Sequence, residues 1–173
     1  WKADKKNYVK KSTFSAYVLL IENHLLPSFG NQYEIQEADV QAFVLQKLES
    51  GLSQKTIKDI LIVLKMVLKF GAKNKWIAYE PFEIQYPTIR ESQHIEVLSR
   101  THQKKIMNYI QEHFTFRNLG VLICLSSGMR IGEICALTWE DIDADNGIIS
   151  VNRTIQRIYV IDEGTRKTEL ILD

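Results

Sequence analysis

Arg130 is the residue whose type and position most directly suggest chemistry. It ends a small polar junction, Ser126-Ser127-Gly128-Met129-Arg130, and apolar residues recur at helical spacing on both sides, so we expect two short buried helices with a tight turn at Gly128. The serines would cap the second helix and place Arg130 in its first turn. A cation there opposes the helix dipole, which favours a guanidinium that binds an anionic oxygen. The alternative is an ordinary solvated arginine beside a turn.

Other chemistry-bearing patterns are missing from the 173 residues. There is no Cys-x-x-Cys, His-Glu-x-x-His, calcium-loop or Walker-type pattern, so we expect neither a metal nor a cofactor. Cys124 and Cys135 lie in apolar helical patterns and are expected to be buried, reduced thiols. The longest aliphatic run, residues 60–64, is too short to cross a bilayer, and no signal-peptide pattern is present, so we expect a cytoplasmic protein.

Charge is distributed unevenly along the chain. Residues 1–90 contain 13 Lys and Arg against 9 Asp and Glu, whereas residues 91–173 contain 9 against 12. A basic excess in the first half favours contact with a polyanion there.

One predicted helix, residues 53–73, concentrates this positive charge. Its apolar residues fall in one sector, and five lysines, which we call the lysine row, fall in a narrow arc on another side. The lysine row consists of Lys55, Lys58, Lys65, Lys69 and Lys73. Two interpretations remain open: the lysines contact the phosphates of a nucleic acid, or they form a solvated helix face.

Periodicity predicts a mainly helical chain. In the first half, helices are expected at 10–26 and 38–48 as well as 53–73; Ser12 or Thr13 would cap the first, and Pro27 with Gly30 would end it. Residues 81–87 then break the helical pattern, and a polar segment follows.

The second half begins with helices and changes to strands. Further helices are expected to carry Ile106 and Ile110, and to span about 117–125. A turn signal at Asp145-Asn146-Gly147 and β-rich runs at 148–151, 155–161 and 168–172 predict a three-stranded antiparallel sheet.

The stretch around Arg130 resembles a known family. Residues 127–134, Ser-Gly-Met-Arg-Ile-Gly-Glu-Ile, and residues 136–143, Ala-Leu-Thr-Trp-Glu-Asp-Ile-Asp, look like the first catalytic box of the tyrosine recombinases, the phage integrase family. The resemblance implies that Arg130 is one of two arginines that clamp the scissile phosphate. It also implies that Glu133 orients that site, with a plain helix-surface carboxylate as the alternative.

The same resemblance points to a general acid near the end of the chain. In tyrosine recombinases, a lysine in the turn between the second and third strands protonates the leaving oxygen. Lys167 stands at the corresponding place, and its neighbour Arg166 is a rival because hairpin register cannot be fixed from the sequence. A hairpin lysine in water is the alternative.

The first half is similar to the helical core-binding domain of integrases, through residues 12–14, 21–30 and 52–57. The implied fold is mainly α with a small antiparallel β-sheet: a SAM-like core-binding domain at 1–88, a linker at 89–96, and the first part of an α+β catalytic domain at 97–173. The implied partner is double-stranded DNA, with self-association into a tetramer in the full-length protein and no membrane. The candidate DNA contacts are Lys55, Thr56, Lys58, Lys65 and Lys69.

Two parts of the family pattern have no match. No His-x-x-Arg follows Arg130, and Tyr159, the only later tyrosine, lies in the predicted β-region, so we expect no nucleophile in this chain. The resemblance implies site-specific recombination of a mobile element through a 3′-phosphotyrosyl intermediate in the full-length parent, while this chain at most binds DNA. The alternative is a non-catalytic DNA-binding module that ends near Asp173.

Overall fold

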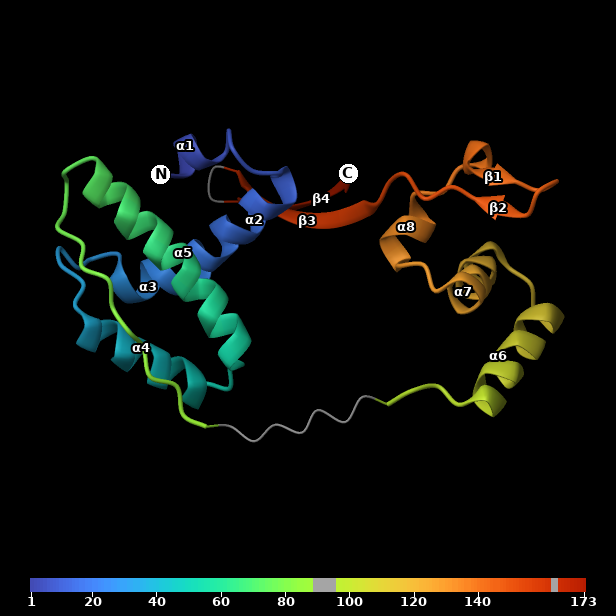
Figure 1. The fold of residues 1–173 in the computed structure, drawn as a ribbon, viewed down its shortest axis with the longest axis horizontal. Coiled ribbons are helices and arrows are strands. Elements are labelled where there is room, and N and C mark those ends of the chain that lie inside the picture. The colour runs from blue at the N-terminus through green and yellow to red at the C-terminus, as the bar shows by residue number, and fades with distance from the viewer. Residues whose placement is uncertain (89–95, 163–164) are drawn as a thin grey trace. The chain divides into compact units, whose positions relative to one another are not determined.

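The computed structural model describes residues 1–88, 96–162 and 165–173, which fall into two compact units (Figure 1). The first unit is Trp1–Arg90 with Tyr159–Lys167, and the second is Glu91–Ile158 with Thr168–Asp173. The expected linker, 89–96, lies almost wholly outside the described residues. The sequence-based domain boundaries remain a prediction.

The N-terminal part of the first unit is built from helices. They are α1 (Lys2–Lys5), α2 (Lys11–Leu20), the π-helix η1 (Ile21–Leu25), α3 (Leu26–Phe29), α4 (Glu37–Glu49) and α5 (Gln54–Lys73). The predicted helices at 38–48 and 53–73 are confirmed. Ser53 caps α5, because its hydroxyl oxygen accepts a hydrogen bond from the Thr56 amide at 3.1 Å.

Two expectations about the first predicted helix are wrong. Lys10, not Ser12 or Thr13, precedes α2, and it makes no side-chain cap. Pro27 does not end the helix; it lies in the first turn of α3, a position that accepts proline. The wider π turn of η1 immediately precedes it, and Gly30 then follows the last residue of α3.

The core of this unit lies where α4 and α5 meet η1 and α3. Val40, Val44, Ile57 and Ile60 are fully buried there, which follows from their i, i+3 and i, i+4 spacing on two facing helices. Other core residues are Leu25, Phe29, Phe43, Leu61, Val63, Leu64 and Phe82. Phe82 reaches the core from the extended segment 79–88, so this segment packs on the helical unit.

The second unit begins with α6 (Arg100–Glu112), α7 (Phe116–Ser127) and α8 (Ile131–Cys135), followed by the 3₁₀-helix η2 (Trp139–Asp141). Ser99 caps α6 and Thr115 caps α7 through bonds from the amides of residues 102 and 118. The expectation that the two helices around Arg130 are buried is wrong: neither α7 nor α8 has a buried residue. Within this unit, α7 packs against α6 and α8.

The strands form two sheets instead of the expected three-stranded one. β1 (Ile142–Asp143) pairs antiparallel with β2 (Ile148–Ile149), across the predicted turn at residues 145–147. β3 (Ile155–Asp162) pairs with β4 (Thr165–Leu172) in a separate sheet. The chain leaves the strand conformation between β2 and β3, where Arg153 binds Asp141, and this separates the sheets. No helix in the described residues is long and apolar enough to cross a membrane.

Candidate functional site

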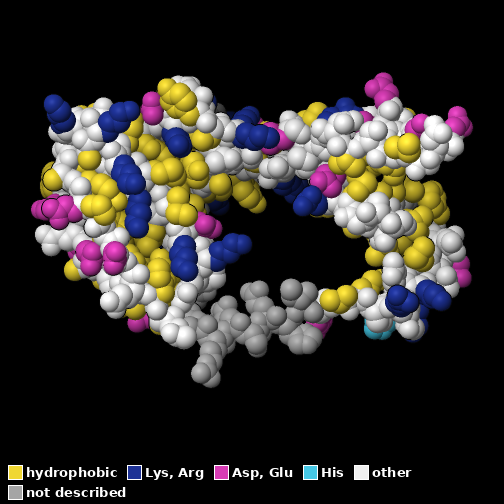
Figure 2. Space-filling view, in the orientation of Figure 1, with side chains coloured by type: hydrophobic (Ala, Val, Ile, Leu, Met, Phe, Trp, Pro, Cys, Tyr) yellow, Lys and Arg dark blue, Asp and Glu magenta, His cyan; other side chains and the backbone are white. Residues whose placement is uncertain are grey.

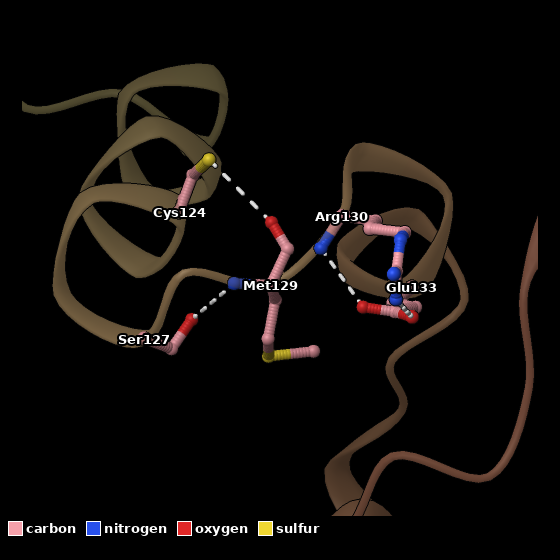
Figure 3. Close-up of polar contacts among 5 residues, drawn as sticks. All are labelled: Cys124, Ser127, Met129, Arg130 and Glu133. Atoms are coloured by element: carbon pink, nitrogen blue, oxygen red, sulfur yellow. Dashed lines mark hydrogen bonds and ion pairs between the residues drawn. The ribbon is translucent and has the colours of Figure 1, made fainter. Parts of the chain in front are cut away.

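The turn before Arg130 ends α7, and its serines do not cap the start of α8 (Figure 3). Gly128 has a left-handed φ of 71°, as a tight turn at this position requires. The Ser127 hydroxyl donates to the Ile123 carbonyl at 2.6 Å and accepts from the Met129 amide at 3.2 Å. Ser126 and Ser127 therefore belong to the end of α7 and do not cap the following helix, which corrects that expectation.

Arg130 is the residue that precedes α8, not a member of its first turn. Its backbone is extended, with φ −71° and ψ 147°, and its amide donates to Glu133 Oε2 at 2.8 Å. Its guanidinium Nη1 donates to Glu133 Oε1 at 3.1 Å (Figure 3). Glu133 thus takes the place expected for the serines: a carboxylate at the third helical position bonds back to the residue before the helix.

The bonds from Arg130 determine the ionisation of Glu133. The Arg130 amide, and then its guanidinium, lower the pKa of the Glu133 carboxyl from its ordinary value. The Glu133 side chain is 22% exposed, whereas the Arg130 side chain is 86% exposed. A guanidinium has five N–H donors. Glu133 therefore orients Arg130 and leaves donors on its exposed side for another anionic oxygen.

A second polar cluster, missed by sequence reasoning, fixes the chain after α8. The Thr138 amide and hydroxyl donate to Asp141 Oδ2 at 2.9 and 2.8 Å. Arg153 Nη2 donates to Thr138 Oγ1 at 2.9 Å and forms an ion pair with Asp141. These bonds lower the pKa of Asp141 to about 2, and the bond from the Thr138 amide has the largest effect. The Thr-x-x-Asp spacing is a capping signal that could have revealed the first two residues, but nothing in the sequence marks Arg153.

Gly132 brings the start of α8 against the start of β3. A Cβ at this position would lie 2.5 Å from Thr154 Oγ1 and 2.7 Å from the Ile155 carbonyl oxygen, closer than real Cβ contacts allow. Only glycine therefore fits between Arg130 and Glu133 without moving the backbone of the strand.

The structure places Arg166 and Lys167 near the beginning of β4. The Arg166 guanidinium lies 5.1 Å from the centre of the Tyr159 ring. Adjacent residues of a strand point to opposite faces, so Lys167 lies on the face away from that contact. The structure brings Glu133 into contact with Arg130, whereas Lys167 belongs to the other unit. The role of Lys167, and the choice between it and Arg166, stay predictions.

The lysine row is present on α5, but its members differ. Lys58 Nζ lies 4.9 Å from the centre of the Tyr86 ring, and Lys65 Nζ lies 4.8 Å from the centre of the Phe82 ring. Lys55, Lys69 and Lys73 are exposed. Thr56 lies in the helix cap, with its hydroxyl oxygen 2.9 Å from Ser53 Oγ. Figure 2 shows Lys and Arg side chains over the region of α5, with hydrophobic side chains between them.

Both cysteines are free, as expected, but they are exposed and not buried. They lie on α7 and α8 beside a mainly apolar hollow of about 740 Å³, which also includes Phe116, Ile131 and Trp139. The thiols are exposed because neither α7 nor α8 has a buried residue. Among the residues that the structure describes, no three His, Cys, Asp or Glu side chains are grouped closely enough to hold a metal ion.

Comparisons with known proteins agree with this arrangement. Residues 96–169 match the phage integrase family, and residues 1–48 match the phage integrase N-terminal SAM-like domain. A tyrosine recombinase XerC-like protein of Caldanaerobacter subterraneus subsp. tengcongensis is 29% identical over 172 residues, covering 94% of this chain and 44% of that protein. The putative defective protein IntQ of Escherichia coli K12 is 27% identical over 169 residues, covering 88% of this chain and 42% of IntQ.

A solved structure supports the fold. The Tn1549 transposon integrase, in complex with transposon right end DNA, has a TM-score of 0.64 and 22% sequence identity, and the match covers 99% of this chain and 55% of the integrase chain. This chain spans less than half the length of the two curated relatives. Its helical first half, the Arg130 region and both family matches lead to one conclusion: the chain belongs to the phage integrase family, and it contains the core-binding domain and part of the catalytic domain.

Proposed function

We propose that the full-length protein is a site-specific tyrosine recombinase of a mobile element. It cuts and rejoins double-stranded DNA, and residues 1–173 supply DNA-binding surface and one phosphate-binding arginine. The observation that carries the proposal is Arg130, an exposed guanidinium held in one orientation by Glu133 and with donors left for a phosphate oxygen. The names of the relatives, tyrosine recombinases and integrases, support the same reaction class.

The proposed reaction transfers a phosphoryl group twice. A tyrosine from outside residues 1–173 attacks the scissile phosphorus and gives up its hydroxyl proton to a base; a 3′-phosphotyrosyl bond forms, and the bond to the 5′ oxygen breaks. Lys167 gives a proton to that departing oxygen as general acid, and the reverse reaction with a partner strand rejoins the DNA. Arg130 neutralises the charge that builds on the non-bridging oxygens. Glu133 is a positioning residue that acts through Arg130.

A nicked suicide substrate tests Arg130. The short strand released by cleavage diffuses away, so the full-length protein accumulates as a covalent protein–DNA adduct. We expect Arg130→Ala to slow adduct formation by about 10²–10³-fold, as for loss of one oxyanion donor. Arg100→Ala, an exposed arginine at the start of α6, is the matched control and should react normally. Adduct formation at an unchanged rate in Arg130→Ala would refute the assigned role.

A second substrate separates proton donation from charge stabilisation. If the 5′-bridging oxygen is replaced by sulfur, the leaving group needs no protonation. Lys167→Ala should therefore be slow on the oxygen substrate and recover on the sulfur substrate, whereas Arg130→Ala should remain slow on both. If the cleavage rate on the sulfur substrate recovers in Arg166→Ala and not in Lys167→Ala, the general acid is Arg166.

The proposed partners are duplex DNA and further copies of the same protein, which form a recombinase tetramer on DNA. Sedimentation of the full-length protein with its DNA site should show four protomers per complex of two duplexes. If the full-length protein forms no covalent adduct with the suicide substrate and binds DNA as a monomer, the other candidate, a non-catalytic DNA-binding module, is supported.

A further inference from the structure

The extended segment 79–88 lies antiparallel along α5. The Lys65 ammonium contacts the Phe82 ring and lies 3.4 Å from its carbonyl oxygen, and Lys58 contacts the Tyr86 ring. One turn earlier on α5, Gln54 Nε2 donates to the Pro87 carbonyl at 2.6 Å. The 11 helical steps from Lys65 to Gln54 rise about 16 Å, and the five steps from Phe82 to Pro87 cover about the same length when extended. The two elements therefore stay in register over three turns.

The other edge of the segment is bonded to α4. Gln41 exchanges two hydrogen bonds of 3.0 Å with the backbone of Gln85. The Glu83 amide donates to Glu37 Oε2 at 3.1 Å. Phe82 itself is part of the core. The two rings are consequently fixed to the helical unit from both sides, and they are not loose groups that the lysines happen to meet.

A ring that is held in place restricts the conformations of a lysine side chain in contact with it. A free lysine samples many rotamers and loses that freedom when it binds a phosphate. A ring face beneath the ammonium restricts the side chain beforehand through cation–π attraction, while N–H donors stay available on the solvent side. In the described residues of the lysine row, ring contacts involve Lys58 and Lys65 and not Lys55 or Lys69.

We propose that Tyr86 and Phe82 are positioning residues of the DNA interface, which hold Lys58 and Lys65 ready for two backbone phosphates of duplex DNA. This inference rests on the proposed DNA binding and on the prediction from the sequence that the lysine row contacts phosphates. It divides the row into two lysines that are positioned by rings and three exposed lysines for which the described residues show no ring contact. It also gives segment 79–88 a function beyond connecting two domains.

The test is a double-mutant cycle on DNA affinity with the full chain. The probe is a mixed-sequence duplex of about 30 base pairs, because phosphate contacts are independent of sequence. Lys58→Ala should lower the slope of log affinity against log salt by about one unit. Tyr86→Leu should weaken binding about two- to fivefold without changing the slope, because the lysine is still present. Tyr86→Phe keeps the ring and should bind like the parent protein.

The cycle distinguishes positioning from general loosening of the fold. In a Lys58→Ala background, Tyr86→Leu should have no further effect; in a Lys55→Ala background, it should still weaken binding two- to fivefold. Equal losses in both backgrounds, or unchanged or tighter binding by Tyr86→Leu, would overturn the positioning role. If Lys58→Ala and Lys65→Ala both leave the salt slope unchanged, DNA binding by this face is itself wrong.

Discussion

The helical region before residue 88 and the region from α6 to β2 keep their residues in place by different means. In the first, Val40, Ile57 and Ile60 have no exposed surface, and the helices close on a shared core. In the second, Phe116 and Trp139 are more than 80% exposed. Helix caps and short-range polar bonds therefore hold Arg130 in place, with little contribution from a core. A candidate reactive residue can thus be oriented mainly by hydrogen bonds to its neighbours in the chain.

Truncating an isoleucine in each region should show this difference most clearly. Ile57→Ala, at a fully buried position, should lower the free energy of unfolding of the helical region by about 2–5 kcal/mol. Ile131→Ala, where the isoleucine is 73% exposed, should change it by less than about 0.5 kcal/mol. Urea unfolding followed by circular dichroism measures both. Similar losses at the two positions would mean that the second region also has a closed core.

Gly132 tests whether close backbone packing helps to hold Arg130. Gly132→Ala should cost about 1–3 kcal/mol, because the new Cβ would overlap Thr154 and the Ile155 carbonyl. Gly120→Ala is the matched control inside α7: its Cβ would meet Ile134 at an ordinary 3.8 Å, so it should stabilise the helix by about 0.5–1 kcal/mol. Thermal unfolding compares the two. A Gly132→Ala variant as stable as Gly120→Ala would show that α8 and β3 are not in contact.

The Asp141 cluster predicts a local dependence on acid. The pKa of Asp141 is about 2 in the folded chain against 3.8 for the free group, so its stabilising effect is present above pH 4 and is lost as the pH falls toward 2. NMR resonances of Thr138 and Arg153 should follow one titration in that window. Glu140→Gln should leave this titration unchanged, and Asp141→Asn should abolish it. A midpoint near 4 in the parent chain would contradict the bonds from Thr138 and Arg153.

The smallest effect concerns the thiols and involves no change in stability. Cys124 and Cys135 are exposed, so both should react with a thiol reagent in the folded 173-residue chain without denaturant. Single Cys→Ser variants assign each reaction by absorbance. If labelling requires urea, these residues are buried and the second region resembles the first.

The sequence could predict a large part of the fold. Apolar periodicity over 38–48 and 53–73 was sufficient for α4 and α5. Errors arose where competing local signals were close. Ser127 could end one helix or begin the next, and Glu133, three residues after Arg130, took the capping role. Pro27 was misread because a first helical turn accepts proline.

The sequence by itself determined the family, the helical first half, and the neighbourhood of Arg130 and Glu133, because these depend on short-range periodicity and ordered motifs. Only the tertiary structure decided the partners of Lys58, Lys65, Asp141 and Gly132. Each of those residues contacts a partner from another part of the chain. The pairs are Lys58 with Tyr86, Lys65 with Phe82, Asp141 with Arg153, and Gly132 with Thr154. Such pairs arise when folding brings separate elements together, and no local pattern records which side chains will then meet.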